Sequence, residues 1–469
     1  MNTAVKHSKP YETFFLKITF FIYHLFLRLI LFCLKLFKFY LSAKLQKYLA
    51  DRSYPQLIWR KDPLPHQRRI WFHASSGEVE YIKSLLKLWK STYPQDLLFL
   101  SYFSPSALDL IPRISEIDGW APLPVDLPRP CHNFITTLKP DILIIARTDL
   151  WPTLLKSLPH QSKILMASTW SEGSKKTQKY GRWMSQWCLP YLNKICVVNE
   201  EDKQWIEKNL QSIPEIVVTG DPRFDQVQTR LEQKRPLPLL LTQWVQISST
   251  SQRLFIAGST WEQDEEVLFN SIKQIIQPST SLQPQSHPSS SSPYRWIIVP
   301  HENTPSHIQK LKDSLKKLGL SYLLWSEWNH QNQPPLTSSI LIFDEKGWLA
   351  ELYQLADIAF IGGSFKKQVH SVMEALGCGI PVLVGPFYKN NREAIEFSRL
   401  SHRNISFVKE ITSDSSLLTQ YLKDYANIEP SALSEIKEKI KESFKQRCGG
   451  TKKTFIEIQK NLESSHFST

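Results

Sequence analysis

The sequence predicts an α/β protein with two Rossmann-like, doubly wound domains that face a cleft, preceded by an N-terminal membrane helix. Three observations predict this architecture. From about residue 66, short apolar runs alternate with helical patterns, which is typical of a parallel sheet with helices on both faces. The alternation is interrupted near residues 221–250 and then restarts, so two halves of similar size are expected. The N-terminal stretch combines Phe, Leu and Ile with regularly spaced basic residues.

Length, charge and cysteine content narrow the class of protein. The chain has 469 residues and a formal net charge of +13, and it is long enough for two or three domains with full cores. Residues 1–61 hold eleven Lys and Arg against two acids, so the basic excess favours an anionic membrane surface as partner and argues against a nucleic acid. Six scattered cysteines without a CxxC pair argue against a zinc ribbon and favour a reducing compartment.

The N-terminal segment, residues 1–52, predicts a basic amphipathic helix that anchors the chain to a membrane. Lys17, His24, Arg28 and Lys35 are spaced by 7, 4 and 7 residues, which places all four on one helix face. The longest uncharged run is residues 18–27, and a spanning helix needs about 20 mostly apolar residues. We therefore expect an interfacial helix whose basic stripe faces phosphate head groups, with a tilted span or an uncleaved signal-like anchor as alternatives.

Residues 53–225 predict the first doubly wound domain. Its predicted strands are residues 70–73, 97–103, 142–145, 163–167 and 195–198. One helix is predicted from the turn at Ser75 to Trp89, and another opens after Asp149. The acids of residues 200–202 open a further helix, where they suit the positive end of the helix dipole.

Residues 226–250 predict a linker, after which residues 251–428 form the second domain. Its predicted strands are residues 254–257, 296–299, 340–343, 358–361 and 380–384. Residues 278–293 are rich in Ser, Pro and Gln without an apolar period, so they predict a disordered insert. Residues 429–469 predict a charged helical tail.

The stretch around Gly362 and Gly363 indicates a nucleotide site. A predicted strand ends at this glycine pair, a predicted helix follows, and the strand at 380–384 completes a βαβ unit. His370 and Glu374 are four residues apart, so they are expected on one helix face. A helix N-terminus offers free backbone N–H groups to a phosphate, and a carboxylate on that helix suits a ribose. This combination predicts a nucleotide-sugar site.

Eight motifs, taken in order, resemble the Kdo (3-deoxy-D-manno-octulosonic acid) transferases of lipopolysaccharide synthesis. They are the basic apolar N-terminus, residues 71–79 (WFHASSGEV), 149–152 (DLWP), 171–174 (SEGS), 218–225 (VTGDPRFD), 257–262 (AGSTWE), 362–364 (GGS) and 385–386 (GP). The resemblance covers about residues 15–425. It implies a GT-B glycosyltransferase that inverts the anomeric centre, uses CMP-Kdo as donor substrate without a resident cofactor or metal, and acts on a lipid A precursor at the cytoplasmic face of the inner membrane.

The resemblance also assigns roles to residues. It places the catalytic base at Glu78, with Glu80 as the alternative if the register slips. The residues expected to bind the CMP-sugar are Ser259, Thr260, His301, Gly362, Gly363, Ser364, His370, Glu374 and Asn391. Read without the resemblance, Glu78 is a first-turn acid favoured by the helix dipole, and Ser259 or Thr260 is an ordinary N-cap.

The chain departs from the family pattern at several of these positions. Arg147 and Asp149 stand where the family usually has two glutamates, His301 where it has a phosphate-binding arginine, and Ser371 where it has an asparagine. Loss of a guanidinium removes a bidentate phosphate contact. Lys366, Lys367 and Arg392 are candidates to replace that charge. Two alternative functions follow: a GT-B enzyme with another donor or acceptor, and a non-catalytic membrane-bound homologue.

Overall fold

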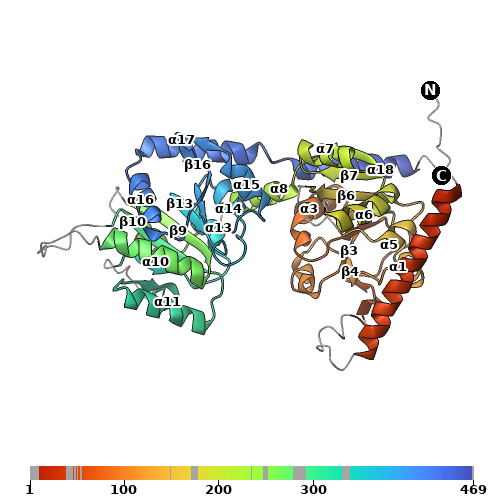
Figure 1. Ribbon diagram of the computed structural model, residues 1–469, viewed down its shortest axis with the longest axis horizontal. Coiled ribbons are helices and arrows are strands. Elements are labelled where there is room, and N and C mark those ends of the chain that lie inside the picture. The colour runs from red at the N-terminus through yellow and green to blue at the C-terminus, as the bar shows by residue number, and fades with distance from the viewer. Residues whose placement is uncertain are drawn as a thin grey trace, which may run out of the picture. The chain divides into compact units, whose positions relative to one another are not determined.

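The computed structural model describes residues 10–37, 46, 49, 51–52, 55–147, 149–170, 178–233, 235–246, 252–277, 292–329 and 338–466. It divides into two compact units (Figure 1). Unit 1 comprises residues 1–226 and 448–469, and unit 2 comprises residues 227–447. Most of the predicted insert and the whole SEGS motif lie outside the described residues.

Unit 1 is built on an eight-stranded sheet in the order β1-β4-β3-β2-β5-β6-β7-β8. All neighbouring strands are parallel except β1 and β4. The strands are β1 (Ile58–Trp59), β2 (Arg69–His73), β3 (Leu97–Tyr102), β4 (Gly119–Pro122), β5 (Ile142–Ala146), β6 (Ser162–Ser168), β7 (Lys194–Val197) and β8 (Glu215–Val218). Their continuous apolar runs suit a parallel sheet that is covered on both faces.

Helices cover both faces of the unit 1 sheet, so its winding is double. The helices are α1 (Pro10–Leu36), α3 (Lys83–Thr92), α4 (Pro128–Leu138), α5 (Pro152–Lys156), α6 (Lys179–Cys188), α7 (Glu200–Asn209), α8 (Pro222–Glu232, which continues into unit 2) and α18 (Gly450–His466). Short 3₁₀ turns are η2 (Gly77–Tyr81), η3 (Pro105–Asp109), η4 (Ile111–Arg113) and η5 (Leu189–Tyr191). Apolar residues of α3 and α18 form one core with the sheet, and those of α4 to α7 form the core on the other face.

Unit 2 contains a seven-stranded sheet, ordered β11-β12-β10-β9-β13-β14-β17, in which every pair is parallel. Its strands are β9 (Arg253–Thr260), β10 (Tyr294–Pro300), β11 (Leu323–Leu324), β12 (Ile340–Ile342), β13 (Ile358–Ile361), β14 (Val382–Val384) and β17 (Val408–Glu410). A small antiparallel pair consists of β15 (Ser401–His402) and β16 (Ile405–Ser406). The predicted α/β class with two doubly wound domains is thus confirmed.

The helices of unit 2 also lie on both faces of its sheet. They are α9 (Leu239–Gln246), α10 (Glu262–Ile276), α11 (Pro305–Lys317), α12 (Trp325–Trp328), α13 (Leu349–Tyr353), α14 (Met373–Gly377), α15 (Arg392–Ser398), α16 (Ser415–Ala426) and α17 (Pro430–Lys445). Helices α10, α11 and α16 share one core with the sheet, while α13, α14 and α17 pack together elsewhere in the unit.

Helix α1, red in Figure 1, packs against unit 1 through its central turns. Phe20 and Tyr23 make edge contacts with Trp187 on α6, and Lys156 on α5 lies 4.2 Å from the ring centre of Phe20. His24 Nε2 is 2.8 Å from Thr153 Oγ1. The prediction that His24 faces lipid head groups with the lysines and Arg28 is therefore wrong, because this imidazole is hydrogen-bonded to the protein.

The predicted linker has helices that the sequence did not indicate, and the predicted helical tail is divided between the two units. Residues 226–250 include the end of α8 and the whole of α9. Within 429–469, α17 belongs to unit 2 and α18 belongs to unit 1. Helix α18 is capped by Asp225, whose carboxylate accepts hydrogen bonds from the backbone N–H groups of Gly449 and Thr451 at 2.5 and 2.7 Å. The end of the chain thus completes the core of unit 1.

Candidate functional site

Each parallel sheet has one point at which the order of its strands reverses, and the predicted site residues gather there. In unit 1 the chain runs from β2 through β3 to β4 and then returns beside β2 with β5. In unit 2 it runs outward from β9 and returns beside β9 with β13. Ligands of open α/β sheets bind at such switch points, outside the carboxyl ends of the strands. Each unit therefore has one expected binding position.

In unit 1, a hydrogen bond joins the two strand ends at the switch point. His73 ends β2, and its Nε2 is 3.0 Å from Oδ2 of Asp149, which follows β5. The other ring nitrogen of His73 is 2.9 Å from the Ser101 hydroxyl at the end of β3. Burial acts to raise the pKa of Asp149, but the hydrogen bond and charge of His73, with Ser75 and Trp151, lower that pKa overall. The side chain of Asp149 is thus an ionised carboxylate that is held in place by His73.

Glu78 lies in the 3₁₀ turn η2, in the segment that follows β2. Its Oε2 accepts a 2.9 Å hydrogen bond from the backbone N–H of Ser76, and this bond orients the carboxylate. Glu80 has different surroundings, because its two oxygens bind Lys83 Nζ and Gln226 Nε2. The two candidate bases therefore differ: Glu80 is an ion-paired side chain that links η2 to α8.

Positive charge gathers next to this turn. The guanidinium groups of Arg147 and Arg223 lie 4.8 and 4.2 Å from the ring centre of Tyr81, which is buried at the end of η2. Arg223 also pairs with Asp221 at 2.6 Å. Arg147 has a left-handed backbone with φ of 63°, an uncommon conformation for a residue with a side chain. The arginine that replaces an expected glutamate thus contacts the ring of Tyr81, in the same turn as Glu78.

In unit 2, three aromatic rings meet at the switch point. His301 follows β10 and stacks on His370, with ring centres 4.3 Å apart, and on Trp261, at 4.7 Å. Trp261 Nε1 donates a 3.0 Å hydrogen bond to His370 Nε2. Burial, with the neighbouring His301, lowers the pKa of His370 to about 4. Burial also lowers the pKa of His301. Lys346 and Lys366 lower this pKa further, whereas Glu302 raises it.

The glycine turn after β13 is fixed by one buried carboxylate. Asp264 Oδ2 accepts hydrogen bonds from the backbone N–H groups of Gly363 at 2.7 Å and Trp261 at 2.9 Å, and Oδ1 accepts one from Phe365 at 3.0 Å. Gly363 has φ of 81°, where a side chain would be strained. A Cβ on Gly362 would collide with the Ser259 carbonyl. Both glycines are therefore required by close packing of the turn.

The structure corrects the prediction that His370 and Glu374 share a helix face. Helix α14 begins at Met373, so His370 precedes it. Backbone hydrogen bonds from His370 N–H to the Gly362 carbonyl and from Val369 N–H to the Phe387 carbonyl keep this segment out of a helix. Glu374 is paired with Arg230 Nη1 at 2.8 Å. The five-residue α14 also supplies no long helix dipole at His370.

The remaining predicted donor residues have internal roles. Thr260 is fully buried, and its hydroxyl donates to Glu265 Oε1 at 2.8 Å. Ser364 is also fully buried, and its hydroxyl links the Ile361 carbonyl to the Gly385 N–H. Asn391 caps α15 by accepting from Ala394 N–H. Ser259 lies at the end of β9 with a left-handed φ of 56°, and strained backbone of this kind concentrates at functional sites.

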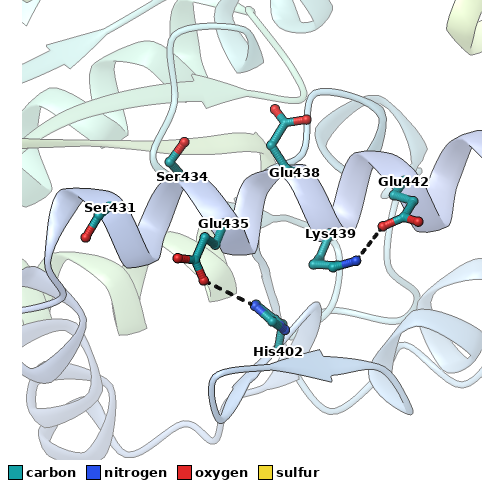
Figure 2. A pocket seen from close by; sticks show the side chains of 7 residues that line it. All are labelled: His402, Ser431, Ser434, Glu435, Glu438, Lys439 and Glu442. Carbon is teal, nitrogen blue, oxygen red and sulfur yellow. Dashed lines mark hydrogen bonds and ion pairs between the residues drawn. The ribbon is translucent and has the colours of Figure 1, made fainter.

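The described residues contain neither a metal-binding cluster nor a second group of predicted site residues. Among the described residues, no three His, Cys, Asp or Glu side chains are arranged to hold a metal ion. A shallow groove lies beside α17 (Figure 2), lined by His402, Ser431, Ser434, Glu435, Glu438, Lys439 and Glu442. It contains none of the predicted site residues, and its charged side chains are ion-paired, as in Lys439 with Glu442 at 2.7 Å and Glu435 with Arg403 at 2.7 Å.

Several residues of these sites were not selected from the sequence. His73 and Trp261 lie inside quoted motifs, but a lone His after a strand or a Trp before a helix is usually a packing residue. Asp264 resembles an ordinary first-turn acid. Only the parallel pairing of distant strands brings His73 to Asp149 and Trp261 to His370, so no local signal identifies them.

Two doubly wound units of this kind define the GT-B fold. Residues 47–226 match the family model described as 3-deoxy-D-manno-octulosonic-acid transferase (Kdo transferase). Curated relatives with the same name include those of Chlamydia trachomatis serovar A, 28% identical over 76% of this chain and 79% of the relative, and Haemophilus influenzae, 23% identical over 74% and 77%. The resemblance to the Kdo transferase family is thus confirmed.

Solved structures support the fold. The UDP-GlcNAc 2-epimerase from Neisseria meningitidis, bound to UDP-GlcNAc, is 12% identical with a TM-score of 0.53, covering 85% of this chain and 100% of that chain. A glycosyltransferase from Rickettsia africae is 12% identical with a TM-score of 0.51, covering 86% and 100%. At such identities the likeness concerns the arrangement of strands and helices.

Proposed function

We propose that this protein transfers Kdo from CMP-Kdo to a hydroxyl of a lipid A precursor, with inversion, at the cytoplasmic face of the inner membrane. The observation that carries the proposal is the position of Glu78, an oriented carboxylate in the turn after β2, at the unit 1 switch point and inside the segment that matches the Kdo transferase family. Curated relatives named 3-deoxy-D-manno-octulosonic acid transferase align with about three quarters of the chain.

The reaction requires a base and a stabilised leaving group. In the proposed step, the acceptor hydroxyl oxygen forms a bond to the anomeric carbon while the bond from that carbon to the CMP phosphate oxygen breaks. The hydroxyl proton passes to Glu78, and CMP leaves with the electron pair. Asp149, held by His73, is suited to accept a hydrogen bond from another hydroxyl of the acceptor sugar. Glu80 is less suited as the base because both of its oxygens are engaged.

The donor is assigned to unit 2. Its switch point offers the His301–His370–Trp261 cluster, the turn at Gly362 and Gly363, and the cation of Lys366 near the indole. A phosphate is met there by neutral imidazoles and one ammonium group in place of a guanidinium. The proposal includes no resident cofactor, because CMP is already a good leaving group.

Membrane association is assigned to the outer face of α1. Residues 16–36 of α1 form a 21-residue stretch that is long and apolar enough to cross a membrane by length and composition. However, Phe20, Tyr23 and His24 near its centre are bound to unit 1. The remaining apolar side chains are exposed, including Phe21, Leu25, Leu29 and Phe32. An interfacial helix, with its outer face in the lipid and unit 1 beneath it, satisfies both sets of residues.

The test is CMP release from CMP-Kdo by detergent-solubilised protein in the presence of a tetraacylated lipid A precursor. Wild type and Glu80→Gln are expected to release CMP only when the lipid is present. Glu78→Gln, which preserves size and removes the base, is expected to lose about 10²–10⁴-fold of the rate. Equal rates for Glu78→Gln and wild type would refute the assignment of the base.

One observation favours a second candidate, a GT-B transferase with another donor. His301 occupies the position of the expected phosphate-binding arginine and stacks on both His370 and Trp261, so the donor site differs from the family pattern. A panel of CMP- and UDP-sugars in the same assay separates the candidates. Release from another nucleotide sugar, with none from CMP-Kdo, would replace the proposed donor.

A further inference from the structure

Trp261 contacts each of the three polar groups that surround the unit 2 switch point. Its indole N–H donates to His370 Nε2 at 3.0 Å, its ring stacks on His301 at 4.7 Å, and Lys366 Nζ lies 3.2 Å from its ring centre. The backbone N–H of Trp261 binds Asp264, the same carboxylate that holds Gly363. Asp264 therefore positions both Trp261 and the glycine turn.

The contact with Trp261 determines which nitrogen of His370 carries the proton. An indole N–H is a donor only, so His370 Nε2 must accept, and the neutral imidazole carries its proton on Nδ1. A Cβ on Gly363 would lie 3.1 Å from Cδ2 and 3.2 Å from Nε2 of His370. This edge of the ring thus packs on Gly363, and the edge that carries Nδ1–H lies away from it. His370 presents a fixed hydrogen-bond donor.

The positive charge of the cluster comes from Lys366. His301 and His370 stack with their rings tilted by only 18°, and two charged imidazoles in this arrangement would repel. Burial lowers the pKa of both. The ammonium of Lys366 is held at the indole by a cation–π contact, an interaction that strengthens when water is excluded. The other charged groups acting on His301 are Lys346 and Glu302.

We propose that Trp261 is a positioning residue of the donor-phosphate site: it fixes His370 as an Nδ1–H donor and holds Lys366 as the site's cation, and the two together replace the missing arginine. This inference rests on the proposed function, which assigns the nucleotide sugar to unit 2. Trp261 acts through its two neighbours and not by its own contact with the reacting atoms.

Matched variants separate the two roles of the indole. Trp261→Phe retains a ring for His301 and Lys366 but removes the N–H, and Trp261→Leu removes both. His370→Asn keeps an N–H near the position of Nδ1, whereas His370→Gln places its amide near Nε2. CMP binding to the full-length protein is measured by calorimetry, and KM and kcat are measured with CMP-Kdo. The tautomer of His370 is read from imidazole ¹⁵N chemical shifts, assigned by comparison with His370→Asn.

The expected wild-type spectrum is that of the Nδ1–H tautomer, with His370 still neutral at pH 6. For Trp261→Phe at pH 8 we expect CMP binding about tenfold weaker and KM raised to match, with kcat within a factor of about two, because one hydrogen bond that orients a phosphate donor is lost. The deficit should be the same at pH 6, because burial, the main cause of the low pKa of His370, is retained in Trp261→Phe. Trp261→Leu should lose more, and His370→Asn should bind CMP better than His370→Gln.

Three results would overturn the inference: an Nε2–H tautomer in wild type, wild-type CMP binding by Trp261→Phe, or the reverse order of His370→Asn and His370→Gln. Failure of the proposed function is distinguishable. A wild-type protein that releases no CMP from CMP-Kdo, but binds CMP and shows the predicted loss in Trp261→Phe, would retain the positioning role and refute the transferase.

Discussion

Tyr23 on α1 donates a 2.9 Å hydrogen bond from its hydroxyl to Oδ2 of Asp126, a carboxylate that is 2% exposed. The same carboxylate accepts hydrogen bonds from the backbone N–H groups of Thr153 and Leu154 at the start of α5. Helix α5 directly follows the segment that contains Asp149. One carboxylate thus connects the proposed membrane helix to the loop that carries a proposed acceptor-site residue.

Removing either partner of this bond should loosen α1 from unit 1. Tyr23→Phe loses a single hydrogen bond to a carboxylate, and we expect it to lower the free energy of unfolding by about 1–3 kcal/mol. Asp126→Ala also leaves two buried backbone N–H groups without an acceptor. It should therefore lower the free energy of unfolding by more, about 3–5 kcal/mol. Urea unfolding in detergent measures both. Equal effects of the two substitutions would show that α5 does not depend on Asp126.

The His73–Asp149 pair should give unit 1 a stability that is lost in acid. Because the pKa of Asp149 is lower in the folded protein, its contribution is present above the unfolded value of about 3.9 and is lost as the pH falls through the folded pKa. In Asp149→Asn this part of the acid-induced loss should be absent. Stability measured between pH 3 and 6 tests the prediction. Wild type and Asp149→Asn should differ in how the free energy of unfolding changes with pH, and parallel curves would contradict the prediction.

The two lysines that bind Glu457 should differ strongly in their effect on stability. Lys194 has a side chain that is 5% exposed and pairs with Glu457 at 2.5 Å, whereas Lys460 is 61% exposed and pairs with the same residue at 2.6 Å. Lys194→Ala leaves a carboxylate partly buried without its main partner and should cost about 3 kcal/mol. Lys460→Ala is the control and should cost less than about 1 kcal/mol. Similar losses would mean that α18 does not need the buried pair.

Gly363→Ala should impair the donor site more than its backbone strain predicts. Its φ of 81° disfavours a side chain, and a Cβ there would also press on His370 and on the Gln368 carbonyl. Gly319→Ala is a matched control, because Gly319 has φ of 72° with only Gln277 near its Cβ position. Gly319→Ala should lose about 1 kcal/mol of stability from backbone strain alone. Gly363→Ala should lose more, and only Gly363→Ala should raise KM for the nucleotide sugar, by about tenfold or more. Unchanged KM in Gly363→Ala would exclude His370 from the donor site.

The exposed face of α1 should determine membrane affinity. Phe21→Ser and Leu25→Ser each remove a large apolar side chain, and each should weaken vesicle binding by about tenfold or more. Leu417→Ser on α16, also exposed, should have no effect. Replacing Lys17, Arg28 and Lys35 with Gln should reduce binding only to anionic vesicles, by about 100-fold. Flotation with neutral and anionic vesicles distinguishes the contribution of the apolar side chains from that of the basic side chains. Unaltered binding in all variants would refute the interfacial assignment of α1.

The sequence predicted the two α/β halves, most of its ten proposed strands to within two residues, and the resemblance to the Kdo transferases, but not the strands β1, β4, β8, β11 and β15 to β17. These depend on apolar runs and glycine turns, which are local signals. The tertiary structure decided the rest. Only parallel pairing brings His73 beside Asp149, and only hydrogen bonds of the loop after β13 place His370 outside α14. The burial of Thr260 and Ser364, and the turn of His24 toward Thr153, likewise depend on contacts between residues distant in the chain. Helical spacing shows which residues share a face, but the neighbouring elements determine where that face points.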